Sequence, residues 1–307
     1  MKDITQLDPA ALRTLVVATR LGTFEATARE LHVTPSAVSQ RIKALETRIG
    51  RVLLHRVKPL EPTEAGLVLV RLATQTELLE REAVAELVEG TDEVATSYSS
   101  LPIAVNADTL YSWFVDALAE VQARHRVVFE VVREDHTRTA ERLRRGEVLA
   151  AITAEPRPVP GCRVVRLGRM RYVGVATREF HAAHFSSGVG STTLAEAPLV
   201  AFDRSDSLQH DFARRVTRRH LAPPVTYLPS VREFDRAIRV GMGWGLLPES
   251  DVATELARGD LVELVPGKRV DVPLFWQHWT LGSTVVADLT TAVVGAARGW
   301  LGSVPSA

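Results

Sequence analysis

The segment from residue 23 to residue 58 constrains this chain most, because it contains two short amphipathic stretches joined by a tight turn at residues 32–34. Thr34 can cap the second stretch through its hydroxyl, Pro35 suits the first helical position, and Gly50 can end the helix in the left-handed conformation. The apolar residues of this stretch recur at spacings of four, three and four: Val38, Ile42, Leu45 and Ile49. In an α-helix they share one face, which must be buried. The pattern therefore predicts a helix-turn-helix.

The opposite face of this second helix is polar. Ser36, Gln40 and Lys43 lie across the helix from the apolar residues, and their hydroxyl, amide and ammonium groups suit the base edges and phosphates of DNA. In isolation, such a pattern is more often that of an ordinary amphipathic helix with a solvated polar face. The candidate DNA-contacting residues lie on this helix and just beyond it: Thr34, Pro35, Ser36, Ser39, Gln40, Arg41, Lys43, Arg56 and Lys58.

The distribution of charge favours DNA binding. Residues 29–58 contain seven Lys or Arg and only two Glu, whereas the whole chain has 37 basic and 37 acidic residues. A local basic patch on a neutral protein is what contact with a phosphate backbone requires.

A wing is predicted directly after the second helix. Residues 51–62 have the pattern of a short strand pair around a turn, and Arg56 and Lys58 would lie on it beside the backbone of the duplex. A further helix is predicted upstream, between Pro9 and Gly22. Three helices and a wing make a winged helix-turn-helix.

These motifs resemble the DNA-binding domain of LysR-type transcriptional regulators. The resemblance spans residues 12–66 and rests on GTFEATARELHVTPSAVSQRIKALE, on the GRVLLHR wing and on the PTEAG that opens the next helix. It implies a homodimer or homotetramer that binds double-stranded DNA and acts with RNA polymerase at a promoter.

Residues 63–89 predict one long helix with Thr63 as its cap. Its inward positions follow alternating steps of four and three: Ala65, Leu69, Leu72, Thr76, Leu79, Ala83 and Glu86. Such a heptad seam predicts pairing with a second copy, as helix-turn-helix units that read two half-sites require. The alternative is a single helix packed on its own domain. Seven Glu against two Arg between residues 61 and 89 predict that this segment does not touch phosphate.

After a polar stretch at residues 90–100, short β-branched runs alternate with helical patterns, and an amphipathic helix follows from about residue 283 to 300. This alternation predicts parallel α/β units in two sets. The two sets resemble the two-lobed, periplasmic-binding-protein-like effector domain of LysR-type proteins. The resemblance implies that the chain crosses between lobes near residues 167–172 and returns near residues 275–279.

The expected fold class is α/β with an all-α winged helix-turn-helix at the N-terminus. The expected domains are the DNA-binding domain at residues 1–62, a linker and dimerisation helix at residues 63–90, and an effector-binding domain at residues 91–307. Within the last, we expect lobe I at about residues 101–168 and 278–307, and lobe II at about residues 169–277.

Ligands of such folds bind in the cleft between the lobes, at the carboxyl ends of strands. Backbone N–H groups at residues 106–109 can receive a carboxylate, and Asn106 or Asp108 can hold an ammonium group, although Asp108 alternatively only caps its helix. Acidic residues after the next strand suit a cationic ligand or belong to a solvated loop. The candidate effector-binding residues are Asn106, Ala107, Asp108, Thr109, Glu134, Asp135, Thr153, Phe202, Asp203, Ser230, Gly243 and Trp244.

Over nearly its full length, and notably in IAVNADTLYSWF and AIRVGMGWGLLPE, the chain is similar to the ArgP/LysG branch of the family. This resemblance implies a basic amino acid effector (lysine, arginine or histidine) and activation of a lysine or arginine exporter gene. The residues themselves are only compatible with a zwitterion that carries a distal positive charge. The alternative is an architectural or replication-origin-binding DNA protein without a small-molecule effector.

Other classes of protein lack support in the sequence. Dinucleotide-binding, P-loop, nucleophile-elbow and HExxH motifs do not occur, so we expect no enzyme, no cofactor and no metal site. The single cysteine, Cys162, cannot form an internal disulfide. No apolar run approaches the roughly 18 to 20 residues of a membrane span, and the first ten residues lack the apolar core of a secretory signal. We therefore expect a cytoplasmic protein with no membrane contact.

Overall fold

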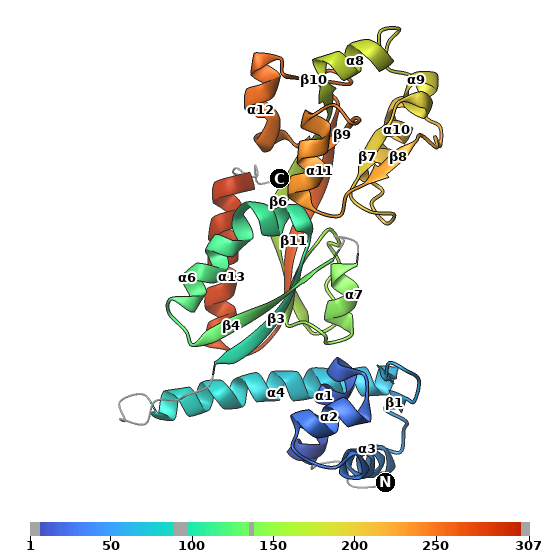
Figure 1. Ribbon diagram of the computed structural model, residues 1–307. Coiled ribbons are helices and arrows are strands. Elements are labelled where there is room, and N and C mark those ends of the chain that lie inside the picture. The colour runs from blue at the N-terminus through green and yellow to red at the C-terminus, as the bar shows by residue number, and fades with distance from the viewer. Residues whose placement is uncertain (1–6, 89–97, 135–137, 302–307) are drawn as a thin grey trace.

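The computed structural model of the chain describes residues 7–88, 98–134 and 138–301. Three parts follow one another along its length (Figure 1): an N-terminal unit with the long helix α4, then lobe I, then lobe II. Most of the predicted linker at residues 90–100 lies outside the described residues, as does the candidate Asp135.

The N-terminal unit is a winged helix-turn-helix, as predicted. Helix α1 begins at Asp8, whose carboxylate accepts the backbone N–H of Ala10 at 3.0 Å. The wing is an antiparallel pair in which Leu54 lies opposite Pro62. Leu15, Ile42 and other side chains of α1, α3 and the wing form a separate buried core. The elements of this unit are α1 (Pro9–Leu21), α2 (Phe24–Glu30), α3 (Pro35–Ile49), β1 (Leu54–His55) and β2 (Glu61–Pro62).

Helix α4 (Glu64–Val88) runs from the wing to lobe I, and Thr63 caps it by accepting the N–H of Gly66 at 3.1 Å. The predicted heptad seam is only partly exposed. Leu69 is buried against α1 in the core of the N-terminal unit, as the single-helix alternative requires, whereas Leu72 and Leu79 face solvent. Ala65 is half-buried, Thr76 and Ala83 are exposed, and the side chain of Glu86 lies outside the described part.

Lobe I is built on three parallel strands, with β3 hydrogen-bonded to β4 on one side and to β5 on the other. A helical run with one π-helical turn follows β3, and α6 packs beside the C-terminal helix α13 (Figure 1). The elements are β3 (Ser99–Val105), α5 (Ala107–Thr109), η1 (Leu110–Phe114), α6 (Val115–Gln122), β4 (Val127–Arg133), α7 (Thr139–Arg144), β5 (Ala150–Thr153) and α13 (Thr284–Leu301).

Two long antiparallel strands, β6 (Cys162–Thr177) and β11 (Arg269–Trp279), make both crossings between the lobes. The sheet is therefore mixed, with strand order β10-β6-β11-β5-β3-β4 and β9 on β6, whereas the sequence predicted parallel units alone. The outward crossing coincides with the predicted residues 167–172. On the return, Phe275 already pairs with Thr153 of lobe I, and the register shifts between Leu274 and Phe275.

Lobe II packs helices around the far halves of β6 and β11 and around a small parallel pair, β7 and β8. The sequence pattern missed α9, which has six residues, and α12, which has ten. The elements are α8 (Arg178–His184), α9 (Ser191–Glu196), β7 (Leu199–Ala201), α10 (Leu208–Thr217), β8 (Val225–Tyr227), α11 (Val231–Arg239), β9 (Gly245–Pro248), α12 (Glu249–Arg258) and β10 (Leu261–Glu263).

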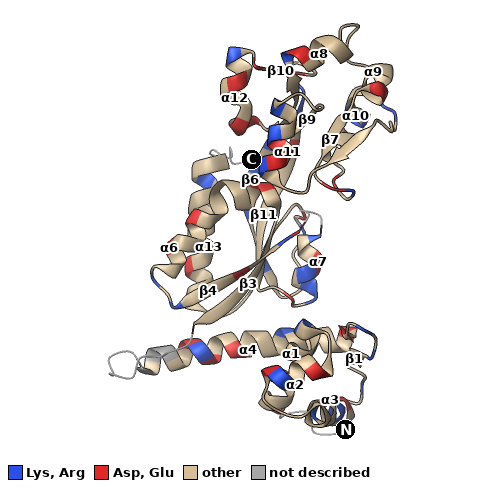
Figure 2. Cartoon of the chain, in the orientation of Figure 1, with Lys and Arg blue, Asp and Glu red and all other residues tan. Residues whose placement is uncertain are grey.

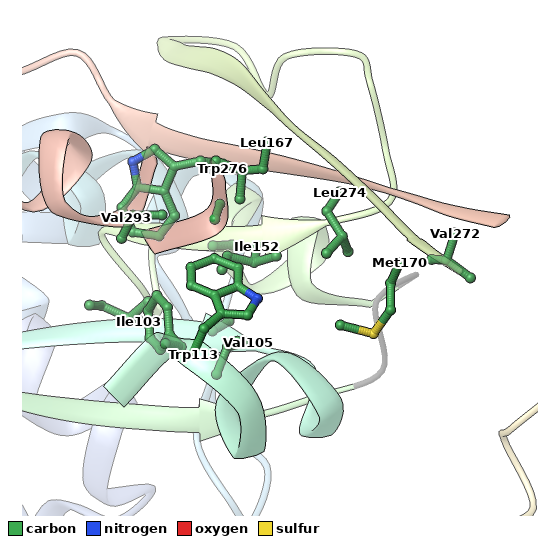
Figure 3. Close-up of a cluster of buried hydrophobic side chains, with 14 of the residues drawn as sticks. Ile103, Val105, Trp113, Ile152, Leu167, Met170, Val272, Leu274, Trp276 and Val293 are labelled. Carbon is green, nitrogen blue, oxygen red and sulfur yellow. The ribbon is translucent and has the colours of Figure 1, made fainter. Parts of the chain in front are cut away.

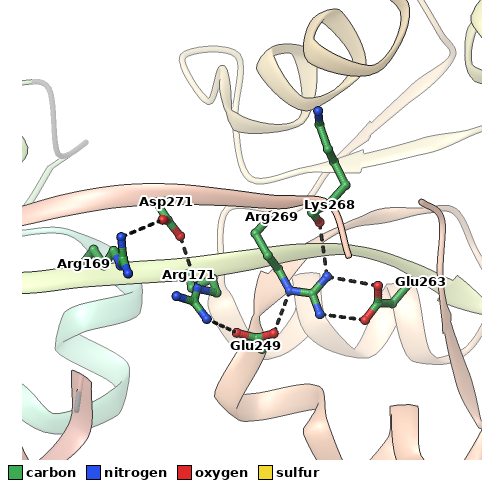
Figure 4. Close-up of polar contacts among 7 residues, drawn as sticks. All are labelled: Arg169, Arg171, Glu249, Glu263, Lys268, Arg269 and Asp271. Atoms are coloured by element: carbon green, nitrogen blue, oxygen red, sulfur yellow. Dashed lines mark hydrogen bonds and ion pairs between the residues drawn. The ribbon is translucent and has the colours of Figure 1, made fainter. Parts of the chain in front are cut away.

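A network of ion pairs fastens α12 and β10 to the long strands (Figure 4). The Arg269 guanidinium contacts Glu249 at 2.6 Å and Glu263 at 2.7 Å, while Arg171 contacts Glu249 at 3.3 Å and Asp271 at 3.4 Å. Hydrogen bonds from Arg269 hold the pKa of Glu263 below its usual range. These charges hold the first residues of β11 in place within lobe II.

The largest core lies around the crossing strands and the sheet of lobe I (Figure 3). Trp276 of β11 is fully buried, and its indole N–H donates to the hydroxyl of Thr290 on α13 at 3.0 Å. Trp113, in the π-helical turn of that first helical run, is buried in the same cluster. Aromatic side chains of this size bury large apolar areas, which makes the crossing region rigid.

Helix α4 is docked on lobe I through Arg71. Its guanidinium lies 5.3 Å from the ring centre of Trp279 and donates to the carbonyl oxygen of Arg144 at 2.8 Å. Gly146 has φ +68° and leaves room for this side chain, since a Cβ there would lie 2.2 Å from Cγ of Arg71. Farther along α4, Leu78 is buried in the core of lobe I. The N-terminal unit is thus attached to lobe I by specific contacts.

Gly66 gives a test of how the wing is seated on α4. A Cβ at this position would lie 2.0 Å from the carbonyl oxygen of Leu53. We expect Gly66→Ala to force the wing away from α4 and to lower the free energy of unfolding by about 1–3 kcal/mol. Calorimetric unfolding of the full chain measures the change.

The matched control is Gly295→Ala in α13, where a Cβ meets open space. Alanine is a better helix former than glycine, so this variant should gain up to about 1 kcal/mol. Equal unfolding midpoints for the two variants would contradict the predicted clash at Gly66.

Candidate functional site

The turn and cap of the helix-turn-helix place α3 as the sequence predicts. His32 has φ +52°, which turns the chain sharply after α2, and the hydroxyl of Thr34 accepts the N–H of Ala37 at 3.1 Å. Val38, Ile42 and Leu45 are buried beneath the helix. The opposite face of α3 is therefore turned to solvent.

The predicted DNA-contacting residues lie on that exposed side. Ser36, Gln40 and Lys43 are exposed. Figure 2 shows the charged residues around them on the N-terminal unit. The remaining candidates divide by position: Thr34, Pro35, Arg56 and Lys58 are exposed, and Ser39 and Arg41 are half-buried.

Glu46, which the sequence patterns did not single out, joins α3 to the wing. Its carboxylate accepts the backbone N–H of Leu53 at 2.9 Å and lies 3.9 Å from the guanidinium of Arg56. This contact fixes the start of the wing relative to α3. An acidic residue in a basic segment, seven positions before Leu53 and ten before Arg56, was the available signal.

A pocket lies between the two lobes, at the carboxyl ends of β3, β4 and β7, where a ligand site was expected. Both lobes and the crossing strand β6 contribute to its wall. The lining residues are Asn106, Ala107, Asp108, Arg133, Glu134, Tyr172, Phe202, Asp203, Ser205, Asp206, Leu208, Gln209, Phe234 and Leu246.

Six candidates from the sequence line this pocket: Asn106, Ala107, Asp108, Glu134, Phe202 and Asp203. Five others do not, for identifiable reasons. Thr109 is buried inside lobe I, and the hydroxyl of Thr153 accepts the N–H of Glu155 at 3.1 Å. Ser230 is exposed and donates to Glu233. Gly243 packs on the backbone of Pro198, and Trp244 is fully buried in the core.

The pocket is acidic. Asp108, Glu134, Asp203 and Asp206 line it together with one cation, Arg133. The hydroxyl of Ser205 holds the pKa of Asp203 below its usual range. Four carboxylates around one small cavity favour a ligand that carries positive charge.

Each carboxylate already has a protein partner. Tyr172 donates to Asp108 at 2.5 Å, and burial together with this carboxylate raises the pKa of Tyr172 well above its ordinary value. Glu134 pairs with Arg142 of α7 at 3.0 Å. Asp206 accepts the N–H groups of Phe202 and Leu208, which shapes the loop before α10.

Several lining residues escaped the sequence analysis. Arg133 is the last residue of β4, and its guanidinium lies 4.9 Å from the ring centre of Phe202, so it bridges the lobes. Tyr172 lies on the crossing strand, and Asp206 and Gln209 lie around the start of α10. A search limited to the first residues after each strand does not reach these positions.

No group of three or more His, Cys, Asp or Glu in the described ranges is arranged to hold a metal ion. None of the helices in those ranges is long and apolar enough to cross a membrane.

Comparison with known proteins matches both halves of the chain. Residues 9–67 match the family of bacterial regulatory helix-turn-helix proteins of the lysR type, and residues 99–290 match the LysR substrate binding domain. The HTH-type transcriptional regulator LysG of Mycobacterium tuberculosis is 44% identical over 297 residues, which cover 96% of this chain and 95% of LysG.

Two solved structures are similar over the full length. The crystal structure of ArgP from Mycobacterium tuberculosis has a TM-score of 0.83 at 43% identity, covering 96% of this chain and 98% of ArgP. Full-length LysG from Corynebacterium glutamicum with bound effector Arg has a TM-score of 0.78 at 40% identity, covering 95% of this chain and 99% of LysG.

The exposed face of α3 gives a direct test. We expect Lys43→Ala to weaken binding to duplex DNA from the region flanking its own gene, and to reduce the slope of log affinity against log salt by about one. Gln40→Ala should cost about 1–3 kcal/mol of specific binding and leave that slope unchanged. Fluorescence anisotropy at several salt concentrations measures both effects.

Lys268→Ala is the charge-matched control, because Lys268 is exposed in lobe II, far from α3. Its affinity and salt slope should equal those of the unchanged protein. Unaltered binding in both α3 variants would show that another surface reads the DNA.

Proposed function

This chain belongs to the LysR family of bacterial transcriptional regulators, and we propose that it senses a basic amino acid and activates an exporter gene in response. It is a regulator of the LysG/ArgP type, in a family of regulators rather than enzymes. The observation that carries the effector assignment is the inter-lobe pocket, in which four carboxylates face one Arg.

The pocket suits a zwitterion with a distal positive charge. Arg133 can pair with the α-carboxylate of the ligand, because its guanidinium lies in the pocket wall, 4.9 Å from the ring centre of Phe202, and carries N–H donors that suit a carboxylate. The carboxylates attract the ammonium or guanidinium groups of lysine, arginine or histidinium. The C. glutamicum LysG structure holds arginine as its bound effector, which supports the same class of ligand here.

The route from pocket to DNA runs through lobe I. Glu134 of the pocket pairs with Arg142 of α7, and the carbonyl of Arg144 at the end of α7 accepts from Arg71 of α4. Arg142 also pairs with Glu147 at 2.7 Å, so a ligand cation that competes for Glu134 would change the charge balance around Arg142 and, through α7, the contact with α4. Such coupling between two sites typically amounts to about 1–3 kcal/mol.

The working form is a homodimer or homotetramer. Large apolar side chains are exposed along α4, at Val68, Leu72, Leu79, Val84 and Leu87. Leu87 is 81% exposed. Pairing with α4 of a second copy would bury such apolar side chains. The two α3 helices of such a dimer can then bind two half-sites on DNA.

As a DNA-binding activator, the protein acts in the cytoplasm with RNA polymerase at the promoter. The regulated gene encodes a lysine or arginine exporter. This assignment is supported by the similarity to LysG of Corynebacterium efficiens, whose name is "lysine export transcriptional regulatory protein" and which is 44% identical over 296 residues.

Calorimetric titration of the full-length protein with L-lysine, L-arginine and L-histidine tests the effector assignment. We expect saturable heat with at least one of them and none with L-norleucine, which lacks the distal charge. A footprint on promoter DNA should change when that ligand is added.

If none of the three basic amino acids gives heat and none alters the footprint, the effector assignment is overturned. That result would favour an architectural or origin-binding role.

A further inference from the structure

Two amide groups in the pocket have oxygens without a partner. The Oδ1 atom of Asn106 and the Oε1 atom of Gln209 are buried and accept no hydrogen bond from any described residue. Asn106 is 7% exposed and Gln209 is 1% exposed, yet both line the pocket. Buried amide oxygens are normally satisfied, so this pair is arranged for a group that is bound there.

The two amides come from opposite lobes. Asn106 follows β3 in lobe I, and Gln209 lies in the first turn of α10 in lobe II (Figure 1). Phe212 and Ala213 of α10 are buried in the core, which fixes the position of Gln209. One ligand that satisfies both oxygens would join the two lobes.

Unlike these amide oxygens, the carboxylates of the pocket already accept hydrogen bonds within the protein. Asp203 accepts the N–H and hydroxyl of Ser205 at 2.7 and 2.5 Å, and Asp108 accepts from Tyr172. These carboxylates attract any cation through their negative charge, although they already accept hydrogen bonds within the protein. The affinity of the neutral amide oxygens for a ligand depends instead on how many N–H groups the ligand has and on where these groups point.

We propose that Asn106 and Gln209 are specificity-determining residues that accept hydrogen bonds from one bound guanidinium and so favour arginine over lysine. A guanidinium presents five N–H donors in a rigid plane and can reach two separated oxygens at once. An ammonium group presents three donors around one atom, so it is less suited to donate to one oxygen on each lobe at the same time. This inference rests on the proposed function, because it concerns the same pocket and the same class of ligand.

The test compares arginine and lysine binding by calorimetry on the full-length protein. Gln209→Leu should weaken arginine binding at least tenfold and lysine binding by less, so that the preference between them narrows. Gln209→Glu keeps the acceptor oxygen, replaces the NH2 group with a second acceptor oxygen and adds a negative charge, so it should bind arginine at least as tightly as the unchanged protein. His210→Ala is the control, since His210 is exposed on the same helix and does not line the pocket.

Thermal unfolding separates a binding role from a structural one. Without ligand, Gln209→Leu should unfold at the same or a higher temperature, because it removes a buried acceptor that has no donor. The stabilisation on adding arginine should shrink in this variant. A merely structural glutamine would give the opposite result, with a lower unfolding temperature and an unchanged arginine preference.

The outcomes distinguish the two proposals. If the unchanged protein binds arginine and Gln209→Leu binds it equally well, the role of Gln209 is overturned and the effector assignment stands. If Gln209→Leu does not fold, a tenfold loss of arginine binding in Gln209→Glu overturns the inference by itself. If the unchanged protein binds no basic amino acid, both proposals fail.

Discussion

The pairing of β6 with β11 is the constraint on which the rest of the effector half depends. These two antiparallel strands run through both lobes, so the lobes share one hydrogen-bonded ladder and cannot separate without breaking it. The ladder is irregular at one place, between Leu274 and Phe275, where the register shifts. A register shift bends and twists a strand pair locally, so the ladder changes direction at this point while the strands stay paired.

Hydrogen bonds beside this point keep it ordered. Gln277 of β11 is fully buried, donates to the carbonyl oxygens of Glu155 and Arg157, and accepts the N–H of Val159. It therefore anchors the loop that links β5 to β6. The pocket walls come from both lobes and from β6, so they depend on this ordered strand pair.

Local patterns in the sequence predicted local structure well. The caps at Asp8 and Thr34, the buried face of α3 and the wing follow from residues close to one another in the chain. The features that the sequence did not predict depend on residues that are far apart in the chain. The antiparallel pairing of β6 and β11 joins residues about a hundred positions apart, and alternating strands and helices alone favour parallel units. Gln209 reached the pocket only because the loop before α10 folds back on Asp206.

Helix α4 shows that one periodic pattern can serve more than one surface. Its apolar residues make two contacts within the chain, Leu69 under α1 and Leu78 in the core of lobe I, whereas Leu72 and Leu79 remain exposed. The predicted seam included Leu69 with Leu72 and Leu79 and left out Leu78, because a heptad count alone does not separate these surfaces. One helix contacts both the DNA-binding unit and lobe I, through Leu69 and Leu78. In the proposed mechanism, α4 would therefore carry a change at the contact between Arg71 and α7 to the DNA-binding unit at its far end.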